Sequence, residues 1–234
     1  MAHRKTLAEL RTAVRDNLDE SATGFWTDAT LNRMVNRSKD RVWLEVRKLK
    51  DDFFAVTRTS LDGVLTIVGD SYDTASFRLV AGTRDYTLPP DLAELKTIEA
   101  VTSTYEWVRF TASDTARAAM RAAMEVTEQV DPHGFLFDII GERTLRLAPK
   151  SNRSLDLRLT YIAVVPDLTA ETDTLEMPHP LYKAVEEYAT ASALKMDRDQ
   201  NAAAWESSGN ATITTFIGAH SRQNQDPEYV EPYL

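Results

Sequence analysis

Residues 24–43, GFWTDATLNRMVNRSKDRVW, carry the pattern that decides the fold of this chain. Two aromatic residues precede Thr27 and Asp28, and either of these polar residues can cap a helix. Apolar residues then recur at helical spacing along one face and continue beyond the quoted stretch. The pattern predicts a long helix that ends near Asp52. Its apolar face comprises Leu31, Val35, Val42, Val46 and Leu49.

The opposite face of this predicted helix is basic. A basic face is either a solvated surface or a contact for an acidic partner, and the sequence leaves both readings open. Phe25 and Trp26, just before the cap, can pack on the first turns as a hydrophobic staple that fixes the angle at which the chain enters the helix. The basic residues are Arg33, Arg37, Arg41, Arg47, Lys48 and Lys50, interrupted by Asp40 and Glu45.

Helices are also expected at both ends of the chain. Thr6 and Glu9 form a capping-box pattern before a short apolar stripe, which predicts a helix within residues 6–20. Residues 177–199 contain two closely spaced prolines near their start and continue as a helix, and a further helix follows over 200–224. Residues 225–234 contain two prolines, three acids and two tyrosines, which predicts an extended tail.

The middle of the chain has a different residue pattern. Short β-branched and aromatic runs, punctuated by Gly, Pro, Asp and Ser, predict consecutive and mostly antiparallel strands. One helix, over 113–129, interrupts them. The predicted fold class is α+β: a helical bundle formed by the N- and C-terminal helices, with a β-rich insertion and an extended C-terminal tail. The expected boundaries are 1–52, 53–165, 166–222 and 223–234.

Composition narrows the function classes. The chain has 234 residues and a net charge of −9, which argues against a sequence-independent nucleic-acid binder. Residues 1–50 hold 11 basic and 7 acidic residues, so the first part is mildly basic and the rest acidic. No apolar run approaches a membrane span, and we expect neither export nor a membrane partner. The absence of cysteine excludes disulfides and thiolate metal sites.

Catalytic motifs were sought without success. The chain has no G-x-S-x-G, no glycine-rich phosphate loop and no H-E-x-x-H, and its four histidines are far apart in the sequence. We therefore expect no catalytic residue, cofactor or metal. One alternative is a small-ligand or carbohydrate-binding α+β protein with a site around Trp107, Phe110, Phe135 and Phe137. A weaker one is a regulatory nucleic-acid binder that uses the basic helix.

Several segments in a characteristic order carry a family resemblance. The aromatic-(S/T)-D-x-x-L-N-x-x-x-N stretch from Trp26 to Asn36 resembles the second helix of tailed-phage head-to-tail adaptor proteins. The helix TLAELRTAVRDNL before it is similar too, as are R-D-Y-T-L-P-x-D-L-x-E-L-K-T-I from Arg84 to Ile98, the L-R-L-A-P and L-R-L-T-Y-I strands, and the closing P-x-P-L-Y-K-A-V-E-E-Y-A-T-A-S-A-L helix. Together these segments cover most of the chain, although no single one is highly specific.

The resemblance implies a structural virion protein without catalysis. Such adaptors form a ring, usually twelvefold, beneath the portal protein in the neck of the virion, where they join capsid to tail. It implies assembly in the host cytoplasm, a contact with a downstream tail or nozzle protein, and passage of duplex DNA through the lumen during ejection. Arg33, Arg37, Arg41 and Arg47 would then meet an acidic face of the neighbouring subunit. Tyr229, Val230, Tyr233 and Leu234 would anchor a portal-docking arm.

Overall fold

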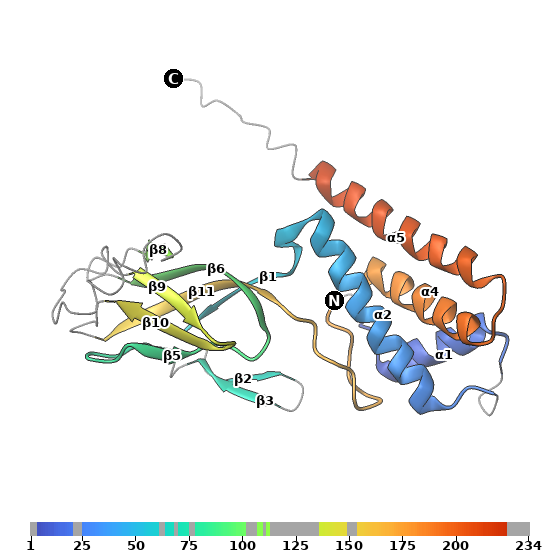
Figure 1. The fold of residues 1–234 in the computed structure, drawn as a ribbon, viewed down its shortest axis with the longest axis horizontal. Helices are drawn as coiled ribbons and strands as arrows, with labels where there is room; N and C mark the ends of the chain where they lie inside the picture. The colour runs from blue at the N-terminus through green and yellow to red at the C-terminus, as the bar shows by residue number, and fades with distance from the viewer. Residues whose placement is uncertain are drawn as a thin grey trace, which may run out of the picture. The chain divides into compact units, whose positions relative to one another are not determined.

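The computed structural model describes residues 4–20, 25–60, 64–67, 70–74, 78–101, 107–109, 111–112, 136–148 and 154–223. Helices and antiparallel sheets together confirm the α+β class (Figure 1). The chain divides into two compact units: unit 1 comprises Met1–Phe53 and Val165–Leu234, and unit 2 comprises Phe54–Val164. The helix expected over 113–129 and the tail over 224–234 lie outside the described residues.

Unit 1 contains four described α-helices, two from each end of the sequence. They are α1 (Leu7–Asn17), α2 (Asp28–Leu49), α4 (His179–Met196) and α5 (Ala202–Gln223), and a 3₁₀ turn, Asp51–Phe54, follows α2. The central helix is α4, which contacts α1, α2 and α5 (Figure 1). Its side chains are buried on nearly every side, which explains why it is less amphipathic than α1 or α2.

Local sequence signals set the helix ends. The Thr6 side chain accepts a hydrogen bond from the Glu9 N–H, and the Glu9 side chain accepts one from the Thr6 N–H, so the predicted capping box is confirmed. Thr27 is the N-cap of α2, where its hydroxyl accepts from the Thr30 N–H. Pro178 caps α4 without a side-chain hydrogen bond. Each signal is local, so each could be read from the sequence.

The apolar stripes of the four helices meet in one core. The predicted stripe of α2 is buried except for Leu49, which is 61% exposed. Burying side chains of this kind stabilises each by roughly 1.5–3 kcal/mol relative to leaving them exposed. The fully buried members include Leu7, Leu10, Val14, Leu31, Val35, Val42, Val46, Leu181 and Val185.

Residues 165–178, called the return segment here, lead into α4 and pair with the start of the chain. The Leu7 N–H donates to the Asp173 carbonyl at 2.9 Å, and the Leu175 N–H donates to the Lys5 carbonyl at 2.9 Å. These main-chain bonds join positions that are far apart in the sequence. They hold the beginning of α1 close to the segment that leads into α4.

The return segment is also bound by two polar side chains of α2. The Asn36 amide donates to the Leu168 carbonyl and accepts from the Leu168 N–H, each at 2.9 Å. The Lys39 ammonium is 1% exposed and donates to the Val165 carbonyl at 2.8 Å and to Asp167 at 2.7 Å. A buried ammonium is costly unless it is paired, so these partners make Lys39 a specific anchor.

Unit 2 is built from short strands. One sheet has the order β1-β11-β6-β7 with β4 also on β11, a second has the order β5-β10-β9-β8, and β2 pairs with β3. Among the described strands every pairing is antiparallel except β8 with β9, as the sequence predicted for most of them. The strands are β1 (Ala55–Thr59), β2 (Val64–Ile67), β3 (Asp70–Asp73), β4 (Arg78–Leu79), β5 (Asp85–Thr87), β6 (Leu92–Val101), β7 (Trp107–Arg109), β8 (Thr111–Ala112), β9 (Leu136–Ile140), β10 (Thr144–Ala148) and β11 (Leu155–Ala163).

The core of unit 2 uses inward-facing residues of these strands. Leu157, Leu159 and Tyr161 alternate with more exposed residues along β11, as the predicted half-buried strand requires. The Tyr86 hydroxyl accepts a hydrogen bond from the Val80 N–H at 3.1 Å. The adaptor-like R-D-Y-T-L-P stretch therefore contributes a buried aromatic ring and a polar contact to this core. Further core members are Leu79, Leu88, Ile98, Ala100, Leu145 and Leu147.

The packing of α4 on α5 generates a prediction about Gly209. A Cβ on Gly209 would lie 2.9 Å from a carbon of the Tyr188 ring, which is 1% exposed and hydrogen-bonded to Asn210. We expect Gly209→Ala to lower the free energy of unfolding by about 1–3 kcal/mol, because the ring must shift. Urea unfolding followed by tryptophan fluorescence measures it.

Gly218 of the same helix provides the control. A Cβ there meets nothing within 4 Å, so we expect Gly218→Ala to raise stability by roughly 0.5–1 kcal/mol through helix propensity alone. Equal effects of the two substitutions would contradict a close contact at Gly209.

Candidate interaction surfaces

The start of α2 is held to α1 by a polar cluster around Arg15. The Arg15 guanidinium is 7% exposed; it pairs with Asp28 at 2.6 Å and donates to the Trp26 carbonyl at 2.8 Å. It also pairs with Glu20 at 3.2 Å, and Glu20 in turn accepts from the Trp26 N–H at 2.8 Å. The main chain of Trp26 is therefore bound on both sides by polar groups of the preceding helix and turn.

The two aromatic residues before α2 differ in exposure. Phe25 is 79% exposed, whereas Trp26 is half-buried, and their rings meet edge to face at 5.0 Å. The stapling role of these residues stays a prediction. The role of Arg15 could not be predicted from the sequence, because nothing in the spacing from Arg15 to Asp28 indicates that the two side chains meet.

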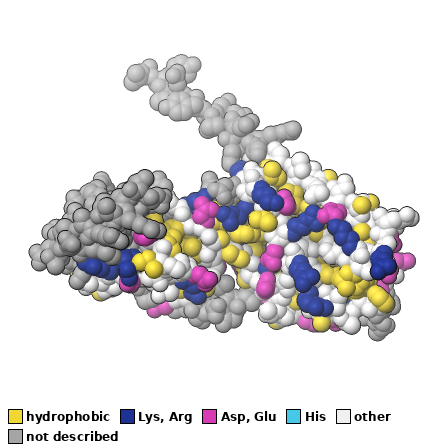
Figure 2. Space-filling view, in the orientation of Figure 1, with side chains coloured by type: hydrophobic (Ala, Val, Ile, Leu, Met, Phe, Trp, Pro, Cys, Tyr) yellow, Lys and Arg dark blue, Asp and Glu magenta, His cyan; other side chains and the backbone are white. Residues whose placement is uncertain are grey.

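The four arginines singled out on α2 do not share one environment. Arg33 and Arg37 are exposed, and Arg33 donates to the nearby Thr30 hydroxyl at 3.3 Å. The guanidinium of Arg47 lies over the Trp43 ring at 4.9 Å, within the same helix. Figure 2 shows Lys and Arg side chains recurring along α2, with acidic and apolar side chains between them.

Arg41 contacts the neighbouring helices, although its side chain remains 39% exposed. Its guanidinium lies 4.1 Å from the centre of the Tyr188 ring on α4 and pairs with Glu206 on α5. Glu206 also accepts from Lys195 at the end of α4. Hydrogen bonds from Lys195 and then Arg41 hold the pKa of Glu206 below its usual range. Arg41 therefore joins three helices of one subunit.

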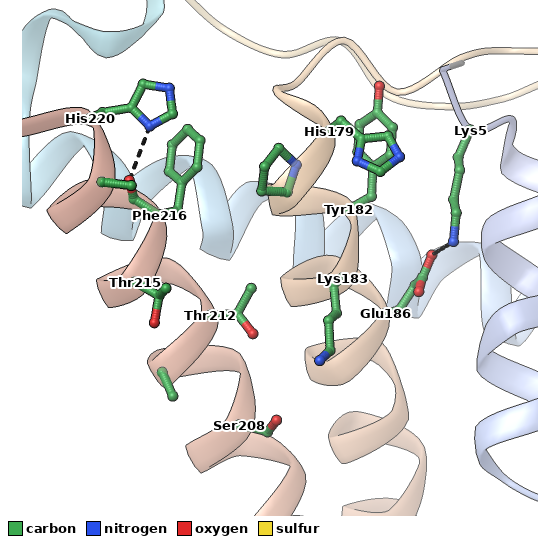
Figure 3. Close-up of a pocket in the computed structure, with 13 residues that line it drawn as sticks. Lys5, His179, Tyr182, Lys183, Glu186, Ser208, Thr212, Thr215, Phe216 and His220 are labelled. Carbon is green, nitrogen blue, oxygen red and sulfur yellow. Dashed lines mark hydrogen bonds and ion pairs between the residues drawn. The ribbon is translucent and has the colours of Figure 1, made fainter. Parts of the chain in front are cut away.

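A groove lies between α4 and α5 and has a volume of about 850 Å³. Figure 3 shows Ser208, Thr212 and Thr215 on the α5 wall, with Lys183 on the α4 wall. Most of the α5 side chains that line the groove are small, apart from Phe216 and His220. Its lining comprises Lys5, His179, Pro180, Tyr182, Lys183, Glu186, Ser208, Ala211, Thr212, Thr215, Phe216, Ala219 and His220.

The polar groups of the groove are only partly satisfied by one another. Lys5 pairs with Glu186 at 2.6 Å, and the His220 ring nitrogen lies 3.1 Å from the Phe216 carbonyl. The Lys183 side chain is 72% exposed, and its ammonium lies 3.8 Å from Glu187. The groove thus combines apolar surface with an exposed cation.

Of the four residues of the expected ligand site in unit 2, the structure describes the side chain of one, so the site stays a prediction. Phe137 packs against the core, Phe110 and Phe135 lie outside the described residues, and of Trp107 only the main chain is described. A hollow of about 230 Å³ elsewhere in unit 2 is lined by Tyr72, Arg78, Val80, Thr83, Asp85, Tyr86 and Thr87, and contains none of these four.

A buried polar pair in unit 2 has a structural explanation. The Tyr161 hydroxyl donates to Asp91 at 2.9 Å, and Tyr161 is fully buried. Burial raises the pKa of Asp91 and also that of Tyr161. A tyrosine with a raised pKa keeps its proton, so the pair acts as a stable hydrogen bond within the core.

Two searches of the described part of the chain were negative. None of its helices is long and apolar enough to span a membrane. Nor do the described residues include a group of three or more His, Cys, Asp or Glu side chains positioned to hold a metal ion.

A comparison with protein families decides the affiliation. The model of the family described as SU10 adaptor protein matches residues 5–230. The chain belongs to the SU10 adaptor protein family. The resemblance to phage head-to-tail adaptors is therefore confirmed. No curated protein matches the chain.

Membership of the SU10 adaptor family indicates a structural phage protein rather than an enzyme. It also implies a place in the virion neck and interaction with portal and tail proteins. These statements come from the family as a whole. They identify the kind of assembly, and the surfaces described above are where contacts of such an assembly can be sought.

The stretch that suggested this family has a structural role in this adaptor. Trp26 and Asp28 are bound by Arg15, and Leu31 lies in the core. Asn36 binds the return segment through both atoms of its amide. The stretch therefore holds α2 against α1, which precedes it, and against the return segment, which follows much later in the sequence.

The Glu206 cluster generates a pH-dependent prediction. Because the folded state lowers the pKa of Glu206, the carboxylate contributes stability above its ordinary pKa, and this contribution is lost as the pH falls through the lowered value. We expect Glu206→Gln to reduce the free energy of unfolding by about 1 kcal/mol at neutral pH. The difference from the parent should shrink steadily below about pH 4.

Urea titrations of the parent and the variant at several pH values measure this difference. Glu142→Gln, in an exposed turn of unit 2, serves as the charge-matched control and should change stability little at any pH. A Glu206→Gln effect that is the same at neutral and acid pH would refute the ion-pair explanation.

Proposed function

We propose that this SU10-family adaptor forms a ring, usually twelvefold in related adaptors, beneath the portal. In that position it joins capsid to tail and lines part of the channel through which DNA leaves. The observation that carries the proposal is the family match over residues 5–230, which spans both units of the fold. Among the residues of unit 2 that the structure describes, no observation favours the alternative small-ligand function.

The proposed subunit contact uses the outer face of α2. Arg33 and Arg37 are exposed there, and Leu44, which is 47% exposed, follows on the same face. Outside residues 1–50 the chain carries 16 basic and 29 acidic residues, so a neighbouring copy offers opposite charge. A basic face on one subunit and an acidic face on the next give a head-to-tail contact, which can close into a ring.

Arg41 and Arg47 have a smaller part in this proposed contact. Arg41 is engaged by Glu206 and Tyr188, and Arg47 lies over Trp43. We therefore assign the contact chiefly to Arg33 and Arg37. Substitutions of Arg33 and Arg37 should then affect ring closure, whereas a substitution of Arg41 should affect the stability of the subunit.

We expect the double substitution Arg33→Glu with Arg37→Glu to abolish or strongly weaken ring assembly on the portal. The melting temperature of the subunit should hardly change, because both side chains are exposed. Arg41→Glu should do the reverse and lower the melting temperature by several degrees, because it places two carboxylates together. Particle mass with portal and thermal unfolding without portal measure the two effects.

Assembly of the Arg33/Arg37 double variant at parental strength would refute the proposed contact. If the double variant lost as much melting temperature as Arg41→Glu, the outer face of α2 would be needed for the stability of the subunit rather than for a contact between subunits.

The proposed portal-docking arm is the segment after α5. Its candidate anchors lie outside the described residues; they are Tyr229, Val230, Tyr233 and Leu234. The support for the arm therefore comes from the residue types of this segment and from its place after α5. The helix α5 extends to Gln223, and the following segment combines aromatic and acidic residues between prolines. Extended segments with aromatic anchors suit docking into grooves of a partner.

We expect Tyr229→Ala combined with Tyr233→Ala to weaken portal binding by at least about tenfold without lowering the melting temperature. Surface plasmon resonance on immobilised portal rings measures the binding. Asn224→Ala with Gln225→Ala, in the same segment but away from the anchors, is the matched control. Binding of the tyrosine variant at parental affinity would remove the arm assignment.

The net charge fits the proposed passage of DNA. Each subunit contributes −9, and an acidic lumen repels phosphate, so duplex DNA can slide through without being held. A downstream tail or nozzle protein completes the proposed set of partners. Assembly in the host cytoplasm belongs to the same proposal.

A further inference from the structure

The groove between α4 and α5 is large enough for a peptide segment. Its lining also carries an exposed positive charge. Its volume of about 850 Å³ lies within the range of ligand-sized sites. Apolar atoms of Pro180, Ala211 and Ala219 contribute to its lining, and the exposed ammonium of Lys183 lies on one wall (Figure 3). An occupant of this groove therefore needs apolar or aromatic groups together with carboxylates.

The exposed cation of the groove forms only a long ion pair with its nearest carboxylate, Glu187, one turn along α4. Glu187 lies 3.8 Å from Lys183, but it is 2% exposed and already accepts hydrogen bonds from Ser208 at 2.6 Å and Thr212 at 2.8 Å. The ammonium of Lys183 lies on the side of α4 that faces α5 (Figure 3), and its side chain is 72% exposed. A carboxylate of an occupant would form a second ion pair with Lys183.

The sequence that follows α5 has the matching chemistry. Residues 224–234, NQDPEYVEPYL, contain three acids, two tyrosines and no basic residue. We propose that the groove between α4 and α5 is a docking surface for residues 224–234 of the same chain. The aromatic rings would cover the apolar wall, and the carboxylates would face Lys183.

The chain is long enough for this arrangement. The groove follows α5 from Ala219 back to Ser208, which is about 17 Å of helix. Eleven extended residues span up to about 36 Å. Pro227 disfavours helical conformation at Asp226, so the sequence permits a change of direction soon after α5. Tethering next to the groove gives the segment a high effective concentration there, which favours its own chain over a second copy.

Docking in the groove would have a consequence for assembly that rests on the proposed function. If residues 224–234 are also the portal-docking arm, the groove and the portal compete for them. A free subunit would then keep its arm covered, and the portal would release it. Exposure of the arm would be limited to the place where the ring is built.

Intramolecular disulfide formation in the full chain tests the docking. The chain has no cysteine, so Thr215→Cys with Pro232→Cys provides two thiols, one in the groove and one in the segment. With oxidised glutathione and dilute protein, this pair should close at least about tenfold faster than Arg33→Cys with Pro232→Cys, whose first thiol lies on the outer face of α2. Ala211→Cys is a second groove position if Thr215→Cys does not fold.

A charge reversal in the same background makes the test specific. Lys183→Glu should slow closure at least about threefold, because it repels the carboxylates of the segment. Lys48→Glu makes the same change on α2, away from the groove lining, and should leave the rate unchanged.

Equal rates for the groove pair and the Arg33 pair, or insensitivity to Lys183→Glu, would overturn the proposal. Disulfide-linked dimers in place of closed monomers would show that the groove takes the segment of a second copy, which also overturns it. Purified portal rings should slow closure. Rapid closure that portal leaves unchanged would support the docking and count against the arm assignment in the proposed function.

Discussion

The contact on which unit 1 depends is the one between α2 and the return segment. Lys39 buries its ammonium against the Val165 carbonyl and Asp167, and Asn36 pairs with both main-chain groups of Leu168. The Lys39 ammonium is 1% exposed and also pairs with Asp40 on its own helix at 3.0 Å, so a placement of the return segment that removed its other partners would be costly. The observed placement brings α4 and α5 to the first two helices although the whole of unit 2 lies between them in sequence.

Much of the fold could be predicted, because its signals are local. The Thr6 and Glu9 capping box, the apolar stripe of α2 and the alternation along β11 all depend on neighbours in sequence, and the structure confirms them. The strand β3 could not be predicted in the same way, because DSYD lacks the apolar alternation of a strand and is extended by its pairing with β2. The roles of Arg15 and Lys39 were missed for the same kind of reason, since their partners are set by tertiary contacts.

For the candidate surfaces too, some features could be predicted from the sequence and others depend on packing. Helical spacing places the arginines on one side of α2, but only packing shows that Arg41 belongs to an ion-pair cluster with Glu206 and Lys195. The groove between α4 and α5 could not be predicted, because it depends on how two helices pack. The family could be suggested from the sequence because the segments kept their order, and the match over residues 5–230 confirms it. The exposed part of α2 and the groove are the two surfaces that we propose for contacts with partners.

The central claim is that this adaptor becomes a ring on the portal. Its most direct test is the mass and electron-microscopic image of particles formed by the purified full chain with and without portal rings from the same phage. The account predicts a closed ring of adaptor subunits stacked coaxially on one end of the portal, with its mass increased by a whole number of subunits. A chain that stays monomeric beside intact portal rings would contradict the account.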